Sequence, residues 1–477
     1  MTNRNIGKTI DIDNELIYEK YFSDFGPVNL GCVYKYCKIL NEKLGKCLNN
    51  EIIVHYTSSN PKKSTNAAFL MGCFGVLYLS LPPKEALKPL LIQGYNYRPF
   101  QDATQGESAY TISLLDCLQA LDKARQLGFY NFKDFNYEEY NRLDKIEGGD
   151  LNWIVPNKFL AFKGPADIKS PIYHRPEEYI DYFKDNNVKI VIRLNKKMYD
   201  GNVFNDAGIV HYDLFFPDGS CPPKNILLKF LRISECSDGA IAVHCKAGLG
   251  RTGSLIGCYL MKHYRMTSHE AIGWMRLCRS GSVIGQQQEW LEQLEPWLIK
   301  QGNLYRKRMY GDFDKIPTHE YGLYSITQKA LKHRPYFFNK SPSPPPPLQR
   351  QTISDRSSQS RPHASKTRRG SNLVTNASAE KEQYTWALNS PDLISNQRNN
   401  TEDQSKCRSR RSSASGEPRR WTSQEYTVTS LGKRNPSTCQ DYKKMSSGYA
   451  PIPTFCTTQG PIVKTINEAK VRNICAF

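Results

Sequence analysis

The stretch Ala242-Val-His-Cys-Lys-Ala-Gly-Leu-Gly-Arg-Thr-Gly253 is the part of the sequence that decides the fold. An apolar run over residues 239–243 predicts a short buried strand, and residues 253–264 predict a helix directly after the stretch. A strand, a glycine-rich turn and a helix in this order can direct successive backbone N–H groups into one small cavity. Such a cavity suits a dianion such as phosphate.

Two side chains of the same stretch make this cavity reactive. Cysteine is usually a small buried hydrophobe, but Cys245 stands between a histidine and a glycine-rich run that ends in Arg-Thr. Positive surroundings of this kind favour a thiolate, and Arg251 offers a planar fork that matches two phosphate oxygens. We therefore predict a nucleophile and a phosphate clamp in one loop. The predicted phosphate-binding residues are Lys246, Ala247, Gly248, Leu249, Gly250 and Thr252, with His244 in support.

The positive charge of the chain is concentrated toward its C-terminal end. The 477 residues carry a formal charge of +19 and are 39% hydrophobic, which is enough chain for two or three domains. Residues 340–477 contain 22 Lys and Arg, 10 Asp and Glu, and few aliphatic residues. That composition is typical of chain that does not fold, so we predict a disordered Ser/Pro/Arg-rich tail over residues 336–477. Its Ser-Pro pairs match kinase sites, which makes kinases candidate partners.

The signals of several other protein classes are missing. The 14 cysteines form no Cys-x-x-Cys pair, and the first residues lack the apolar core of a signal peptide, so we expect an intracellular protein with reduced thiols. The longest apolar stretch, 67–81, is shorter than the roughly 20 residues that span a bilayer, and we expect a buried helix there. The nine histidines show no metal-ligand spacing. We therefore predict no metal, no cofactor and no nucleic-acid site in the folded core.

A weaker copy of the central unit lies near the start of the chain. An apolar run at 51–56, a polar loop to Asn66 and an apolar helix over 67–79 match the strand, loop and helix around Cys245. Tyr56 stands where Cys245 stands, and no arginine follows at the matching position. We predict a catalytically silent phosphatase-like domain over residues 1–133, which builds one wall of the substrate cleft.

Two further segments follow the silent copy. Residues 134–149 have a helix-favouring composition and end at two glycines, which predicts a linker helix. Asp144 and Asp150 could line a groove for a basic substrate residue, or they could belong to a solvated helix face. Residues 150–335 form the predicted catalytic domain. Its strands at 188–193 and 210–216 alternate with helical patterns, which predicts an α/β fold with a mainly parallel sheet.

A second chemical signal is Asp218, on a turn flanked by proline and glycine 27 residues before Cys245. Cleavage of a phosphate ester by a thiolate needs an acid to protonate the departing oxygen, and a carboxyl group on a loop can supply that proton. We predict this role for Asp218. Gln287 and Gln288 open another predicted helix. Their side-chain amides could orient the attacking water, or they could merely form a polar helix start.

Four of these segments together carry a resemblance to a known family. Residues 244–253, 149–153, 215–220 and 281–288 resemble the cell division cycle fourteen dual-specificity phosphatase family over roughly residues 15–335. The resemblance implies two tandem phosphatase-like domains, of which only the second is active. It further implies substrates phosphorylated on Ser-Pro sites by cyclin-dependent kinases, and a role in mitotic exit and cytokinesis. The implied locations are the nucleus and cytoplasm, with spindle, centrosome and midbody as candidate sites.

By position, the resemblance assigns the nucleophile to Cys245, the phosphate clamp to Arg251 and the general acid to Asp218. The chain departs from the family at the linker, where Asn141 replaces a glutamate, so we expect a weaker preference for a basic substrate residue. Two alternatives stay open: a phosphoinositide 3-phosphatase and a phosphate-binding scaffold without turnover. The first usually has lysine where this loop has Leu249, and the second predicts a lost nucleophile or acid.

Overall fold

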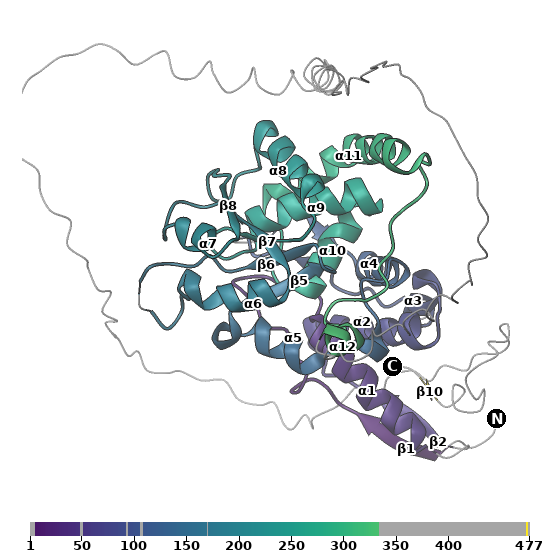
Figure 1. Ribbon diagram of the computed structural model, residues 1–477. Helices are drawn as coiled ribbons and strands as arrows, with labels where there is room; N and C mark the ends of the chain where they lie inside the picture. The colour runs from purple at the N-terminus through teal and green to yellow at the C-terminus, as the bar shows by residue number, and fades with distance from the viewer. Residues whose placement is uncertain are drawn as a thin grey trace, which may run out of the picture. The chain divides into compact units, whose positions relative to one another are not determined.

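The computed structural model describes most of the first 332 residues (Figure 1). The described residues are 5–47, 51–91, 94–104, 108–168, 170–332 and 474–475. Those between 5 and 332 belong to one compact unit. The predicted disordered tail at 336–477 lies outside the described residues, apart from the short strand at 474–475.

The first half of this unit consists of helices beside a small sheet. The order of its strands is β1-β2-β10, and both neighbouring pairs are parallel. A separate antiparallel pair is formed by β3 and β4. The elements are β1 (Asn5–Ile10), α1 (Leu30–Gly45), β2 (Glu51–His55), α2 (Pro61–Tyr78), α3 (Pro83–Leu91), β3 (Phe100–Gln101), β4 (Thr111–Ile112), α4 (Leu114–Gln126), the 3-10 helix η1 (Phe132–Asp134) and, at the far end of the chain, β10 (Ile474–Cys475).

Helix α2 is the buried helix that the apolar stretch predicts, but it begins six residues earlier than Ala67. The side chain of Asn60 accepts a hydrogen bond from the Lys62 N–H at 2.9 Å, and Pro61 occupies the first helical position. Both features are typical helix starts. No described helix is long and apolar enough to cross a membrane.

The second half is built on a five-stranded sheet in the order β5-β6-β9-β7-β8. Only the β5–β6 pair is antiparallel. The elements are α5 (Tyr137–Asp144), η2 (Ile146–Gly148), β5 (Leu151–Val155), β6 (Phe159–Phe162), η3 (Pro176–Tyr179), α6 (Ile180–Asp185), β7 (Val188–Arg193), α7 (Asn202–Asp206), β8 (Val210–Asp213), α8 (Lys224–Cys236), β9 (Ala240–His244), α9 (Gly250–Tyr264), α10 (Ser268–Cys278), α11 (Gln286–Tyr310) and α12 (Ile326–Lys332).

Strand β9 occupies the centre of this sheet. All five of its residues are buried, and it pairs in parallel with β6 on one side and β7 on the other. Figure 1 shows α8, α9 and α11 above the strands and α6 below them. The predicted mainly parallel α/β sheet is therefore confirmed. The loop after β9 leaves the carboxyl edge of the sheet, where α/β proteins place their ligand sites.

The predicted linker helix is shorter than its composition indicates. Helix α5 ends at Asp144 because Lys145 is extended, with ψ at 156°. The Asp150 N–H then donates to the Lys145 carbonyl at 2.9 Å and closes a turn around η2. Strand β8 likewise ends at Asp213, three residues before the predicted end, since the chain turns there toward the loop that carries Asp218.

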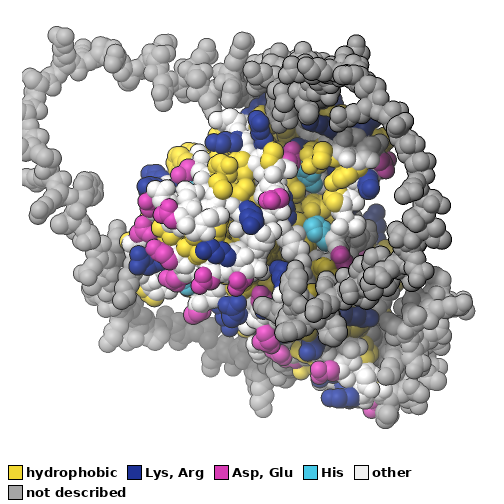
Figure 2. Space-filling model, in the orientation of Figure 1, with side chains coloured by type: hydrophobic (Ala, Val, Ile, Leu, Met, Phe, Trp, Pro, Cys, Tyr) yellow, Lys and Arg dark blue, Asp and Glu magenta, His cyan; other side chains and the backbone are white. Residues whose placement is uncertain are grey.

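The two halves meet where α4 lies against α10. A Cβ atom added at Gly273 would lie 3.1 Å from the Cβ atom of Ala120 and 3.5 Å from the Asp116 carbonyl oxygen. The helices can approach this closely because Gly273 has no side chain. Acidic and basic side chains are interspersed over the described surface on the face shown in Figure 2.

Candidate active site

The loop between β9 and α9 has a backbone whose carbonyl groups all have donors. The carbonyls of His244 and Lys246 accept from the N–H groups of Leu194 and Gly164, and that of Leu249 accepts from Gly253. The carbonyl of Cys245 accepts from the His244 ring, and that of Gly250 accepts from the Ser254 hydroxyl. Arg279 binds those of Ala247 and Gly248. The loop conformation is therefore determined on its carbonyl side.

The amide side of the same loop is free to bind an anion. Within the described part of the chain, the N–H groups of Lys246 to Gly250 donate to no acceptor. The turn requires glycine at Gly248, where φ is +71° and an added Cβ atom would lie 2.1 Å from the Phe162 carbonyl oxygen. Two buried polar atoms, Arg251 Nε and Thr252 Oγ1, also have no partner among the described residues. This set of donors matches a tetrahedral oxyanion.

Arg251 and Asp218 are brought together from separate segments. Arg251 lies in the first turn of α9 and is buried, and its Nη1 donates to the Phe216 carbonyl at 3.0 Å. Its Nη2 lies 2.9 Å from Asp218 Oδ1, and the Asp218 side chain is 66% exposed. A guanidinium at the cradle beside an accessible carboxyl group is the arrangement that phosphate-ester cleavage needs.

His244 lies behind the nucleophile and is neutral. Burial lowers the pKa of His244 to about 3. Its Nδ1 lies 3.0 Å from the Cys245 carbonyl oxygen, which can only accept, so Nδ1 carries the proton. Nε2 then accepts from the Tyr199 hydroxyl at 2.8 Å, and the Tyr199 oxygen accepts from His211 at 2.9 Å. This chain of hydrogen bonds fixes the backbone at Cys245.

Arg279 is a functional residue whose contacts the sequence pattern does not indicate. Its Nε donates to the Gly248 carbonyl at 3.1 Å and its Nη2 to the Ala247 carbonyl at 2.8 Å. The guanidinium also pairs with Asp150 at 2.7 Å. Burial lowers the pKa of Arg279, but Asp150, Asp144 and Cys245 together outweigh it, so the pKa is raised. Arg279 therefore joins the phosphate loop to Asp150, directly after the linker. The only signal in the sequence is its position two residues before the resembling segment 281–288.

The predicted glutamines have different surroundings. Gln287 Nε2 donates at 3.1 Å to the carbonyl of Ser220, two residues after Asp218. Gln288 is buried, accepts from Arg276 at 2.6 Å and donates to the Gly285 carbonyl at 3.3 Å. The Gln286 side chain, which the sequence does not single out, donates to the Gly219 carbonyl at 3.1 Å. Orientation of water by Gln287 and Gln288 stays a prediction.

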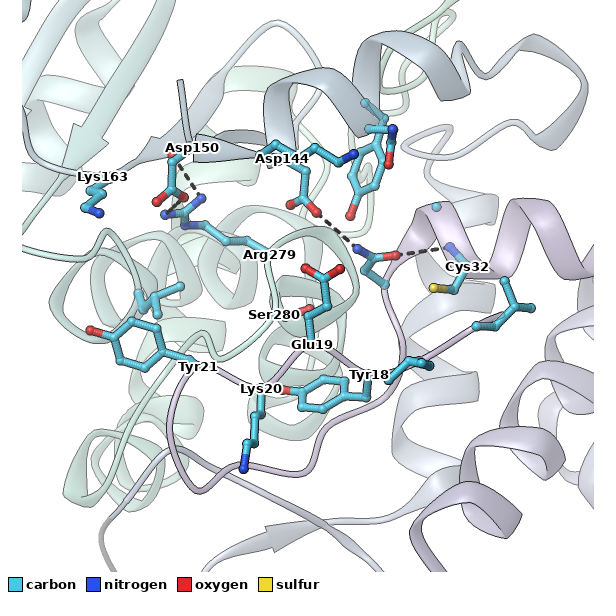
Figure 3. A pocket seen from close by; sticks show the side chains of 18 of the residues that line it. Tyr18, Glu19, Lys20, Tyr21, Cys32, Asp144, Asp150, Lys163, Arg279 and Ser280 are labelled. Carbon is cyan, nitrogen blue, oxygen red and sulfur yellow. Dashed lines mark hydrogen bonds and ion pairs between the residues drawn. The ribbon is translucent and has the colours of Figure 1, made fainter. Parts of the chain in front are cut away.

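A groove of about 540 Å³ leads away from the phosphate loop (Figure 3). Its walls come from the first half of the chain, the linker and the catalytic loop. Both acidic and basic side chains line it. The acids are Glu15, Glu19, Asp144 and Asp150, and the cations are Lys20, Lys35, Lys145, Lys163, Lys246 and Arg279. The groove is therefore mixed in charge rather than acidic.

The two predicted groove acids are both engaged by other side chains. Asp144 accepts from Asn152 at 2.7 Å and from Asn29 at 3.2 Å, and burial raises its pKa. Asp150 is paired with Arg279, as the dashed lines in Figure 3 show. Tyr21 approaches from the opposite wall. Partial burial, followed by the charges of Cys245 and Asp218, raises its pKa, which places its ring near the reactive groups.

Among the described residues, no group of three or more His, Cys, Asp or Glu side chains could hold a metal ion. The candidate site therefore consists of backbone amides, one thiol, two arginines and one accessible carboxyl group.

Two family models match separate parts of the chain. A family model described as "Dual specificity protein phosphatase, N-terminal half" matches residues 2–124. A second model, described as "Polymorphic toxin system, DSP-PTPase phosphatase", matches residues 169–265. The first match lies within residues 1–133, and the second includes Asp218, Cys245 and Arg251.

Relatives at 52–53% identity are named dual specificity protein phosphatases. The chain is 52% identical to human "Dual specificity protein phosphatase CDC14C" over 305 residues, which are 63% of this chain and 68% of the relative. It is 52% identical to mouse CDC14B, covering 63% of each chain, and 53% identical to mouse CDC14A, covering 62% and 50%. The match thus spans about half to two thirds of the length of these curated relatives.

Proposed function

The chain belongs to the CDC14 family of dual specificity protein phosphatases, and on that premise we propose that it hydrolyses phosphoproteins through a cysteinyl-phosphate intermediate. The observation that carries the proposal is the phosphate loop. Its carbonyls are all bound on one side, while its amides, Arg251 Nε and Thr252 Oγ1 have no partner among the residues that the structure describes. A cradle of this kind stabilises the charge that develops on phosphoryl oxygens during transfer.

In the first step, the Cys245 sulfur attacks phosphorus and forms an S–P bond. The P–O bond to the substrate side chain breaks, and Asp218 delivers its proton to the departing oxygen. Arg251 and the loop amides hold the three equatorial oxygens. A bound phosphate would compete with Asp218 for Arg251 Nη2, which is 2.9 Å away, and this would free the carboxyl group to face the leaving oxygen.

In the second step, water attacks phosphorus and the S–P bond breaks. Asp218, which has lost its proton in the first step, now accepts one from the water. Inorganic phosphate leaves and the thiolate is regenerated. Gln287 is held beside Asp218 through the Ser220 carbonyl, so its contribution is to position the loop from which Asp218 acts in both steps.

The substrates that we propose are Ser-Pro sites of the kind made by cyclin-dependent kinases, with phosphotyrosine and phosphothreonine also accepted, in proteins of the cell cycle. Family membership supports this class. The groove supports only a weak preference for a basic residue after the proline. Asp150 is already neutralised by Arg279, and Asp144 is largely buried between two asparagines.

A kinetic comparison tests this proposal. We expect kcat/KM to fall at least about 10-fold when the proline of a phosphoserine peptide is replaced, but only about 2- to 3-fold when the following Lys or Arg is removed, since exposed charge pairs contribute up to about 1 kcal/mol. Cys245→Ser should be inactive on every peptide. Activity in that variant, or faster release of phosphate from a 3-phosphoinositide than from the peptides, would contradict the proposal.

A further inference from the structure

The first half of the chain places one buried carboxylate against the second half, close to the catalytic machinery. Asp102 follows β3 and is 1% exposed. Its Oδ2 accepts from the Gly285 N–H at 2.6 Å and from the Thr104 hydroxyl. Its Oδ1 is buried and has no partner among the described residues. A carboxylate buried this deeply is costly unless the contacts that it makes are maintained.

Gly285 begins the segment that holds the loop of the general acid. Directly after it, the Gln286 side chain donates to the Gly219 carbonyl and the Gln287 side chain donates to the Ser220 carbonyl, each at 3.1 Å. Cys221 Sγ lies 3.7 Å from the Gln286 carbonyl oxygen. These three contacts fix the three residues that follow Asp218. The position of Asp218 therefore depends on where Gly285 lies.

The other end of the same segment is held from within the catalytic half. Arg276 is fully buried and donates to the carbonyls of Ser282 at 3.0 Å and Val283 at 3.1 Å. Burial lowers the pKa of Arg276, and the negative charge of Asp102 opposes that effect. Residues 282–288 are thus held between a cation of one half and an anion of the other. Gly285 itself has φ of 60° and ψ of −137°, a conformation that glycine adopts readily and other residues rarely do.

We propose that Asp102 of the silent half is a positioning residue for the general acid Asp218, acting through Gly285 and the glutamines that follow it. The inference rests on the proposed phosphatase function. Its physical basis is that misplacement of a catalytic group by about 1 Å can cost about 10²-fold in rate. Proton donation matters most when the leaving group is a poor one, such as a serine alkoxide. The silent half therefore contributes to the chemistry as well as to the groove.

The test compares two substrates that differ in leaving group. Asp102→Ala should lower kcat on a phosphoserine peptide about 10-fold, and kcat on an aryl phosphate with an activated phenolate leaving group about 2-fold or less. Asp102→Asn, which preserves the shape of the side chain, should also lower kcat on the phosphoserine peptide, but by a smaller factor. The matched control is His269→Gln, because His269 also contacts the other half, through Asp116 at 3.3 Å, without touching the loop of Asp218. Equal losses on both substrates would overturn the inference.

A second measurement does not depend on turnover. Hydrogen exchange of the amides at 218–221 should become about 10-fold faster in Asp102→Ala and stay unchanged in His269→Gln, because the lost contact loosens that loop alone. If the wild-type chain cleaved neither substrate, the proposed function would fail, while the exchange result would still decide whether Asp102 holds the loop. Unchanged exchange at 218–221 in Asp102→Ala would contradict the inference.

Discussion

Arg279 contributes to the active site without touching the reacting atoms in this structure. It donates to the carbonyls of Ala247 and Gly248, so that these carbonyls are held on the side of the loop opposite its unbonded amides. We predict that Arg279→Lys lowers kcat/KM about 10²-fold, since a lysine keeps the charge but cannot reproduce the fork. The affinity for vanadate should fall as well, because the cradle loses its shape. Steady-state kinetics and vanadate inhibition measure both effects.

The matched control for Arg279 is Lys145→Ala. Lys145 is an exposed cation of the same groove, and its side chain makes no hydrogen bond to the loop among the described residues. It should change kcat/KM about 3-fold or less, as expected for an exposed charge. If the two variants lowered the affinity for vanadate equally, Arg279 would be acting only through its contribution to the charge of the groove.

The residues of the site differ in how far the sequence reveals them. Cys245 and Arg251 lie five residues apart in one loop, so their spacing alone predicts a shared cavity. Asp218 can be predicted from its position on a turn that follows a strand. Arg279 and Asp102 could not be predicted in this way, because their partners are backbone atoms 31 and 183 residues distant in the chain. A pattern of residue types contains no information about which carbonyl or amide a buried charge will reach.

At the scale of elements, α11 packs closely against the end of α9. A Cβ atom added at Gly302 would lie 1.7 Å from the Lys262 carbonyl oxygen. We predict that Gly302→Ala destabilises the protein by about 2 kcal/mol, because overpacking against a fixed backbone costs more than the roughly 1 kcal/mol that alanine gains over glycine in a helix. Urea unfolding measures the difference in the free energy of unfolding.

Gly45 provides the control for this prediction, since it is the last residue of α1 and has nothing within 4 Å of an added Cβ atom. Gly45→Ala should be neutral or stabilise the protein by up to about 1 kcal/mol. A destabilisation of the same size in both variants would mean that the contact with Lys262 is not the cause.

The starts of α2 and α9 could not be predicted from the pattern of apolar residues. Both helices begin before their apolar residues do, at Pro61 and Gly250, since capping and the loop geometry determine the start.

At the scale of the whole molecule, the two halves repeat a strand, a loop and a helix, and this repeat is visible in the sequence. The way in which the two halves associate is not visible in the sequence. It depends on a close helix contact at Gly273, where an added Cβ atom would lie 3.1 Å from the Cβ atom of Ala120, and on single polar contacts such as that of Asp102 with Gly285. Hydrophobic periodicity indicates that α4 and α10 have buried faces, but it does not indicate that these faces meet each other.

One ion pair across this contact makes the association of the halves depend on pH. His269 Nδ1 lies 3.3 Å from Asp116 Oδ2, and the hydrogen bond to Asp116 raises the pKa of His269 above 6.5, with burial opposing and Glu292 and Glu295 adding to the effect. A raised histidine pKa means that the stabilisation is complete below pH 6.5 and is lost as the pH rises through the folded value. Hydrogen bonds outweigh burial and lower the pKa of Asp116 below 3.8. The pair therefore stabilises the folded protein most between about pH 3.8 and pH 6.5.

We predict that His269→Gln lowers the free energy of unfolding by up to about 1 kcal/mol at pH 6 and by almost nothing at pH 8.5. Denaturant unfolding of both proteins at the two pH values measures this, and a difference that does not change with pH would show that the charge of His269 is not involved.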